Sequence, residues 1–222
     1  MENTVKSQIC CADSGSDDFF GPLCVVSCYI NSHDYLWLND LQIDKIDLHD
    51  LKQIIETGQI LKDKLTYSLL LLDNSHYNQM VQLGYKMSQM KVRLYNRALI
   101  NVMQKINEPV DTKVIHLFLT PKKYYKNLKH TSIVVSHLIF ETDYQKYIGL
   151  KCAKILSEYA YYQYFRNMNE ALNIILPHGN NKTANNTGVA LVQHYGKDIL
   201  YKVSKTNMPN YKQILEQIEM SA

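Results

Sequence analysis

The sequence predicts an α/β fold, in which helices flank one mixed β-sheet and the C-terminal part is helical. Strand-like segments come early in the 222 residues, helix-like segments come late, and the two alternate in the middle. This order is typical of a sheet covered by helices. Hydrophobic residues make up 46% of the chain, which is enough for a large core and argues against disorder. At this length we expect a single domain over residues 1–222.

The first part of the fold is expected to be a strand, a loop and a second strand within residues 9–30. Residues 9–11 are apolar, and residues 22–30 form an apolar, β-branched run without a breaker. The loop between them is rich in turn-forming residues. Its acidic side chains are Asp13, Asp17 and Asp18. An acidic loop at the end of a buried strand is a place where a cation or phosphate chemistry can sit.

The next elements are less regular. Residues 31–50 mix Asp, Asn and His with a few large apolar side chains, and they are predicted to be mostly loop, with a short strand or turn. A modest helix is expected over residues 51–64, interrupted near Gly58. Residues 67–72 are all apolar or small and predict a buried strand, and Asp73 provides an N-cap for a short helix after it.

The strongest helical pattern covers residues 86–106. Met87, Met90, Leu94, Ala98, Val102 and Ile106 recur at three- and four-residue steps, as on the buried face of a helix. Lys91, Arg93 and Arg97 are expected on the opposite face.

The second half of the chain adds two β-like segments and three helices. The expected elements are a strand over 114–119, a basic helix that begins at Pro121 after Thr120, an apolar segment over 133–140, a long helix over 142–166 that opens with the capping box Thr142-x-x-Gln145, and an amphipathic helix over 187–205.

The charge is divided unequally along the chain. Residues 1–79 contain 5 Lys or Arg and 12 Asp or Glu, for a net charge of −7, whereas residues 80–222 contain 19 and 9, for a net charge of +10. A basic surface built by the later elements suits a polyanion. Ordinary solvated faces would give the same split.

The cysteines and the N-terminus point to a reducing compartment. Five cysteines are an odd number without a C-x-x-C pair, so buried, reduced thiols are expected rather than a metal cluster or disulfides. No signal peptide is recognisable at the start, and no apolar run is long enough to span a membrane. We therefore expect a cytoplasmic protein without a membrane partner.

Several segments, taken in order, resemble ribonuclease HIII, of the type 2 branch of the ribonuclease H family. The resemblance covers residues 9–212 and rests on the whole ordered set. The matching segments are DDFFGPL at 17–23, LLLLDNSHYNQM at 69–80, KVRLYNRAL at 91–99, FETDYQKYIGLKCAKILSEYAYY at 140–162, and LPHG followed by HYGKDILYKVSK within 176–205.

The resemblance implies two-metal hydrolysis of the RNA strand of an RNA/DNA hybrid. In that family four carboxylates hold two Mg²⁺ ions about 3.5–4 Å apart. By the matched motifs, the four carboxylate positions fall on Ala12, Asp13, His116 and Tyr144. Only Asp13 is acidic, and His and Tyr suit Mg²⁺ poorly as ligands.

The substrate-contacting motifs of the family are also altered. Its glycine–threonine–glycine loop, whose backbone approaches the RNA 2′-hydroxyl, corresponds to Gly15, Ser16 and Asp17. Its serine–lysine–lysine–leucine segment falls near residues 47–52 without recognisable lysines. The separate N-terminal substrate-binding domain of many ribonuclease HIII proteins is expected to be absent.

Three functional interpretations follow from the resemblance. The first is a divergent ribonuclease HIII-like protein, a pseudoenzyme that keeps the fold and some nucleic-acid affinity, with hydrolysis lost or strongly reduced and no cofactor. The second is an active endonuclease using Mg²⁺ or Mn²⁺ in a rebuilt site, with Asp13, Asp17 or Asp18, His116 and Asp143 as ligands, and Glu141 nearby. The third is a non-enzymatic interaction subunit with an unknown protein partner.

Basic side chains are the candidates for nucleic-acid binding, because lysine and arginine contact phosphate without reading sequence. The candidate residues, besides Gly15 and Ser16, are Lys91, Arg93 and Arg97 in the helix over 86–106, and Lys122, Lys123, Lys126 and Lys129 interleaved with Tyr124 and Tyr125.

Overall fold

Two deeply buried antiparallel strands form the centre of the sheet. In the computed structural model, which describes residues 6–220, β1 (Gln8–Ser14) and β2 (Leu23–Ile30) are buried along their whole length. They pair from Gln8 opposite Ile30 to Ser14 opposite Cys24. The predicted strand, loop and strand are confirmed.

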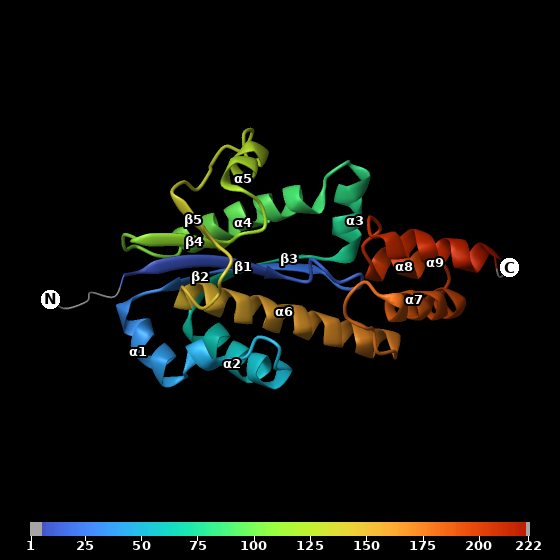
Figure 1. Cartoon of the computed structure of the whole chain (residues 1–222), viewed down its shortest axis with the longest axis horizontal. Coiled ribbons are helices and arrows are strands. Elements are labelled where there is room, and N and C mark those ends of the chain that lie inside the picture. Colours follow the sequence, from blue (N-terminus) through green and yellow to red (C-terminus); the bar gives the residue numbers. More distant parts are fainter. Residues whose placement is uncertain (1–5, 221–222) are drawn as a thin grey trace. The chain divides into compact units, whose positions relative to one another are not determined.

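Three further strands complete a mixed sheet. The order is β3-β2-β1-β4-β5 (Figure 1), where β3 is Thr66–Leu72, β4 is Thr112–His116 and β5 is Leu138–Glu141. β4 runs parallel to β1, and β5 runs parallel to β4. The predicted α/β class with one mixed sheet is therefore confirmed.

The chain separates into two compact units. Within the described residues, unit 1 comprises 6–14, 24–70 and 88–160, and unit 2 comprises 15–23, 71–87 and 161–220. A single domain over residues 1–222 stays a prediction.

In unit 1, helices cover both faces of the sheet (Figure 1). The helices on one face are α1 (Ser32–Asp40), the short helix η1 (Ile43–Lys45), α2 (Leu51–Lys64) and the first part of α6 (Ile148–Leu172). On the other face lie α4 (Met87–Met103) and α5 (Pro121–Asn127).

Alternation along β1 assigns each of its side chains to one of these two layers. Cys10 and Ala12 belong to the apolar core cluster, which includes Leu150 and Ile155 of α6. Because successive strand residues point to opposite faces, Asp13 points toward the α4 layer, where it meets Lys91 and Tyr95. The end of β1 therefore presents a carboxylate to one layer and a methyl group to the other.

Unit 2 consists of helices gathered around the loop that follows β1. Its helices are α3 (Asn74–Gln82), the second part of α6, α7 (Lys182–Tyr195), α8 (Asp198–Val203) and α9 (Pro209–Met220). Backbone hydrogen bonds hold the loop, with Gly21 N donating to Val203 O at 3.0 Å and Lys205 N donating to Phe19 O at 2.9 Å.

Two element predictions fail because of polar capping. Residues 31–50 are not mostly loop, since α1 and η1 lie there. Asn31 and Asp34 form a reciprocal capping box that starts α1. The low hydrophobicity of the segment made this helix hard to predict from the sequence. The proposed capping box at Thr142 does not form, because Glu141 accepts the Thr142 and Asp143 backbone N–H groups in a turn. α6 begins only at Ile148.

Other boundaries also differ from the predictions. The helix expected over 187–205 is two helices, α7 and α8, divided at Gly196, whose φ is +83°. α9 was not predicted. β3 is at an edge of the sheet and half-exposed rather than buried, and β4 ends at His116 rather than at residue 119.

The cysteine prediction is confirmed. Cys10, Cys11, Cys24, Cys28 and Cys152 are all free and buried. Burial raises the pKa of the Cys28 thiol, with a further contribution from the negative charge of Asp34. Within residues 6–220, none of the helices is both long and apolar enough to cross a lipid bilayer.

Gly58 does not interrupt α2, and its lack of a side chain serves packing instead. α2 runs unbroken through it, and a Cβ atom at this position would lie 2.5 Å from the Cβ atom of Tyr159 on α6. Contacts this short force neighbouring side chains to move.

We predict that Gly58→Ala lowers the free energy of unfolding by about 1 kcal/mol. Alanine favours a helix over glycine by ~1 kcal/mol, but overpacking costs typically 1–3 kcal/mol and outweighs it. Urea unfolding measures the change. Lys62→Ala, on the exposed side of α2, is the control and should leave stability nearly unchanged. A more stable Gly58→Ala protein would contradict the packing argument.

Candidate functional site around Asp13

A buried ion pair lies at the end of β1. The Asp13 side chain is only 3% exposed, and its Oδ1 atom is 2.9 Å from Lys91 Nζ on α4. Tyr95, one helical turn further along α4, donates its hydroxyl to the same oxygen at 2.5 Å. A carboxylate buried this deeply is stable only with such partners. The pair therefore fixes the end of β1 against α4.

Aromatic rings pack against the ion pair. The Lys91 ammonium lies 4.4 Å from the centre of the Phe118 ring, within the range of a cation–π interaction. Phe118 in turn contacts the Tyr95 ring, with 4.8 Å between centroids. Burial, together with the negative charge of Asp13, raises the pKa of the Tyr95 phenol well above its ordinary value. Tyr95 is therefore a neutral hydrogen-bond donor.

His116 and Tyr144 form a stacked pair beside Asp13. Their ring centroids are 4.5 Å apart, at an interplanar angle of 15°. Burial lowers the pKa of His116; Asp13 opposes this shift, and Lys91 and Lys154 add to it. Burial also raises the pKa of Tyr144. At neutral pH both rings are therefore uncharged.

A second ammonium group lies on the α6 side of the same strand end. Lys154 Nζ donates to the Asp13 backbone carbonyl at 3.0 Å and to Ser14 Oγ at 3.3 Å. It also pairs with the carboxylate of Glu158 at 2.5 Å, and it lies 5.9 Å from the Tyr144 ring. Lys154 thus joins Asp13, Glu158 and the stacked rings into one site.

Two serine hydroxyls close this network. Ser157 Oγ donates to the Lys154 backbone carbonyl at 2.8 Å, and Ser14 Oγ and Ser157 Oγ are 2.8 Å apart. Because a hydroxyl has one hydrogen, Ser157 must accept from Ser14, which itself accepts from Lys154. The hydrogen bonds run from Lys154 through both serines back to Lys154.

The residues present do not fit a pair of divalent cations. Asp13 contributes a single carboxylate, and Oδ1 of that carboxylate already binds an ammonium and a phenol. Ala12 is fully buried in the apolar core cluster. Between residues 6 and 220, no three His, Cys, Asp or Glu side chains gather as a metal-binding group. Mg²⁺ requires several hard oxygen ligands, and here the ammonium groups of Lys91 and Lys154 bind the carboxylate and the backbone carbonyl of Asp13.

The acids proposed as replacement ligands have other roles. Asp143 is exposed, and its Oδ1 accepts the Gln145 backbone N–H at 2.8 Å, while Glu141 pairs with Lys146 at 2.7 Å. In unit 2, Asp18 accepts the Gly179 backbone N–H. Asp17 is an exposed residue of the same loop.

The loop that contains Gly15 and Ser16 depends on glycine. Gly15 has φ +84°, and a Cβ there would lie 2.3 Å from the Pro22 carbonyl oxygen and 2.6 Å from the Tyr161 ring. The fully buried Lys205 holds the other end of the loop by donating to Asp18 O at 2.8 Å and Gly21 O at 2.7 Å. A side chain at position 15 would therefore be strained in this loop.

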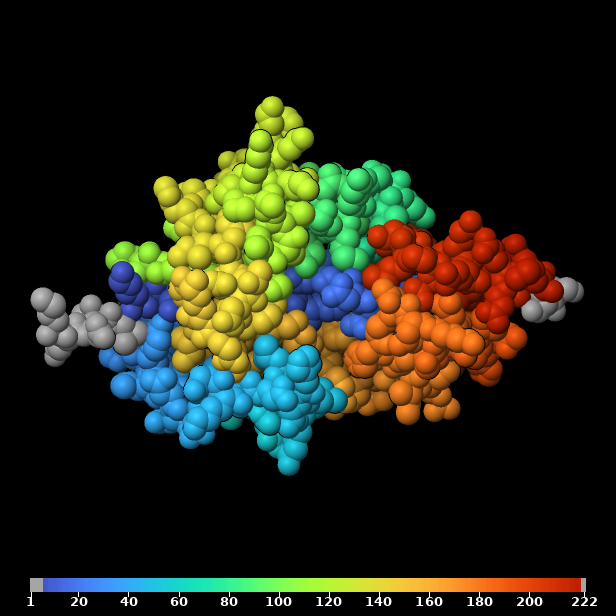
Figure 2. All heavy atoms as spheres, in the orientation of Figure 1, coloured from blue at the N-terminus to red at the C-terminus, as the bar shows by residue number. Residues whose placement is uncertain are grey.

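The predicted basic residues divide into exposed and buried ones. Arg93 and Arg97 on α4 are exposed, as are the four basic residues in and after α5, Lys122, Lys123, Lys126 and Lys129. The segment that contains α5, yellow-green in Figure 2, projects from the surface of unit 1. Lys91, in contrast, is buried against Asp13 and does not lie on an exposed face, and Tyr124 is fully buried.

Sequence reasoning missed Tyr95, Phe118, Lys154 and Glu158 as members of this site. Tyr95 follows Lys91 by four residues, and Glu158 follows Lys154 by four residues. This spacing places each pair on one helix face. The signal was therefore in the sequence, but only the strand register shows which faces meet Asp13.

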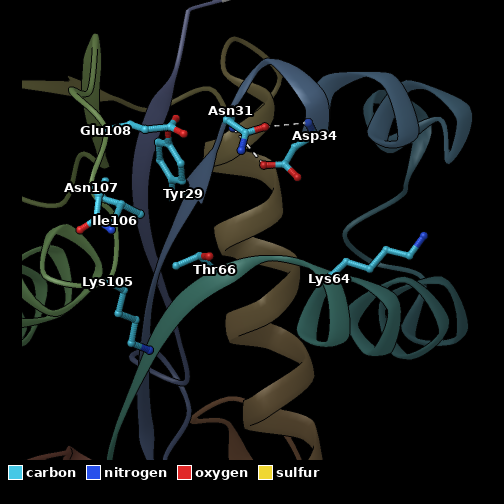
Figure 3. Close-up of a pocket in the computed structure, with 9 residues that line it drawn as sticks. All are labelled: Tyr29, Asn31, Asp34, Lys64, Thr66, Lys105, Ile106, Asn107 and Glu108. Atoms are coloured by element: carbon cyan, nitrogen blue, oxygen red, sulfur yellow. Dashed lines mark hydrogen bonds between the residues drawn. The ribbon is translucent and has the colours of Figure 1, made fainter.

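Unit 1 also contains a polar cavity of about 310 Å³ (Figure 3). Several of its polar groups are already satisfied, since Tyr29 donates to Glu108 at 3.1 Å and Lys105 donates to the Tyr67 carbonyl at 2.6 Å. Figure 3 shows Lys64 pointing away from Tyr29 and Glu108. None of the Asp13-site residues lines this cavity.

The fold is shared with solved ribonuclease structures. The chain superposes on the crystal structure of Bst-RNase HIII in complex with Mn²⁺ with a TM-score of 0.91, at 20% identity, covering 99% of this chain and 72% of that one. The protein is thus ribonuclease H-like in fold. No family model matches the sequence.

Comparison with sequence relatives shows which family within the ribonuclease H-like fold the chain resembles. A ribonuclease HIII of Macrococcus caseolyticus is 31% identical over 210 residues, covering 93% of this chain and 66% of the relative. A ribonuclease HIII of Listeria monocytogenes is 27% identical over 218 residues, covering 96% and 70%. The chain belongs to the ribonuclease HIII family, and it spans about two thirds of the length of these relatives.

The low pKa of His116 predicts a pH effect on stability. The neutral imidazole is favoured in the folded protein, so the unfolded chain binds more protons below its ordinary pKa of 6.5, and stability falls as the pH drops through that value. We predict that the wild type loses more unfolding free energy between about pH 8 and about pH 5 than His116→Phe does. Urea unfolding at both pH values measures this, and equal losses would refute it.

Proposed function

We propose that this protein is a ribonuclease HIII-like pseudoenzyme that has lost hydrolysis of RNA/DNA hybrids and retains nucleic-acid binding. The observation that supports the loss of hydrolysis is the set of contacts made by the Asp13 carboxylate. Asp13 is the only acid at the four family carboxylate positions, and Lys91 and Tyr95 bind Oδ1 of its carboxylate. The cytoplasmic location of the protein and its lack of a cofactor both stay predictions.

Charge balance supports the same conclusion. Two-metal hydrolysis uses the carboxylates to hold two dications, which activate water and stabilise the leaving oxygen. Here the charges of Asp13 and Glu158 are matched by those of Lys91 and Lys154. His116 and Tyr144 are neutral. A scissile phosphate would meet neither an activated water nor a metal to stabilise its leaving group.

The alternatives receive less support. A rebuilt metal site would need Asp143 to join Asp13 and His116, but Asp143 caps a turn. An interaction subunit without nucleic-acid affinity leaves the exposed cations of α4 and α5 without a role. Those cations support a phosphate-binding face on unit 1, because clustered lysines attract a polyanion.

We predict that the wild-type protein does not cleave an RNA/DNA hybrid in Mg²⁺ or Mn²⁺. Restoring the four family carboxylates together, as Ala12→Asp, Asp13→Glu, His116→Asp and Tyr144→Glu, should produce measurable cleavage once Lys154→Ser has removed the ammonium beside Asp13. The assay follows a labelled RNA strand on a denaturing gel. Wild-type cleavage that Asp13→Ala abolishes would overturn the proposal.

Binding is tested separately from cleavage. We predict that replacing Lys122, Lys123 and Lys126 with Gln makes the dependence of log Kobs on log salt shallower by roughly 2–3, because each phosphate contact contributes about 0.9. Fluorescence anisotropy with a labelled hybrid measures this.

A triple change of equal charge provides the control. Lys45, Lys52 and Lys62 are exposed on the opposite helix layer of unit 1, and replacing them with Gln should leave the salt dependence unchanged. If the wild type does not bind a hybrid even at low salt, or if both triple variants behave alike, α5 is not the phosphate-binding face.

A further inference from the structure

The ammonium of Lys154 lies in a cage of oxygen atoms. Its three N–H groups meet the Asp13 carbonyl at 3.0 Å, Ser14 Oγ at 3.3 Å and the Glu158 carboxylate at 2.5 Å. A lysine ammonium has three donors and no acceptor, so this set uses all of them. The Lys154 side chain is 18% exposed and that of Glu158 is 30% exposed.

The cage consists of the ligand types that a hard dication takes. Carbonyl, hydroxyl and carboxylate oxygens bind Mg²⁺, Mn²⁺ and Ca²⁺, with waters completing the coordination. The cage oxygens are held without the cation, since Ser14 is tied to Ser157 and Asp13 is held by Lys91 and Tyr95. Without a positive charge between them, these oxygen atoms would repel one another. The site would then attract a cation.

We infer that Lys154 is a built-in cation that takes the place of a divalent metal at the end of β1. The inference goes beyond the proposed loss of hydrolysis, because it concerns what holds the site together. The protein reaches its folded state without a metal, and it gains no stability from one. Removal of the ammonium creates a site for a divalent cation between Asp13, Ser14 and Glu158.

The experiment compares thermal unfolding in EDTA and in millimolar Mn²⁺. The wild-type midpoint is expected to be equal in both. Lys154→Ser should unfold at a temperature lower by roughly 5 °C in EDTA and recover at least half of this loss in Mn²⁺. Electron paramagnetic resonance of free Mn²⁺ gives an independent readout, with one equivalent bound by Lys154→Ser and none by the wild type. Lys154→Gln, which keeps most of the volume, replaces Lys154→Ser if that variant does not fold.

Lys151→Ser is the matched control. Lys151 is also buried in α6, and it donates to the Asp44 carbonyl at 2.6 Å and the Gln145 amide oxygen at 3.1 Å, without a carboxylate partner among these bonds. Its loss should lower the midpoint in EDTA and in Mn²⁺ alike.

Three results would overturn the inference: no Mn²⁺ recovery in the Lys154 variants, equal recovery in Lys151→Ser, or stoichiometric Mn²⁺ binding by the wild type. This inference alone is overturned if the Lys154 variants neither bind Mn²⁺ nor are stabilised by it, while the wild type neither cleaves hybrid nor binds Mn²⁺. Wild-type cleavage of hybrid overturns the proposed function instead.

Discussion

The contact between Asp13 and Lys91 is the constraint on which the site depends. Neither group tolerates burial alone, because an isolated charge inside a protein costs several kcal/mol and removal of one partner leaves the other uncompensated. The 2.9 Å ion pair, with Tyr95 on the same oxygen, therefore ties the end of β1 to α4. The stacked rings of His116 and Tyr144 lie beside this anchored end, and Lys154 binds its backbone carbonyl.

The substituted positions also complement one another. Two of the four positions matched to the family carboxylates hold neutral rings in mutual contact, and the nearby Lys154 is paired with Glu158. The result has no excess negative charge that would demand a dication. Packing, ion pairs and hydrogen bonds hold this site together.

The motif order predicted the fold, and it marked the positions of Asp13, His116 and Tyr144, which come together in the structure. It could not predict the role of Lys91, which periodicity assigned to the solvent face. Periodicity counts apolar residues, whereas the face of α4 toward β1 becomes polar where the strand ends at a carboxylate. The role of Lys154 could not be predicted for a related reason, since its partners Asp13 and Ser14 lie about 140 residues away in the sequence. Contacts at that separation follow from strand register, which local patterns do not specify.

The burial of Ala12 limits which side chains this protein can accept at position 12. Ala12 is fully enclosed, and Tyr144 packs against the same apolar cluster. An aspartate at position 12 alone would bury an unpaired charge in this apolar cluster, at a large cost in folding free energy. The packing around Ala12 therefore disfavours an acid at position 12 in the present core.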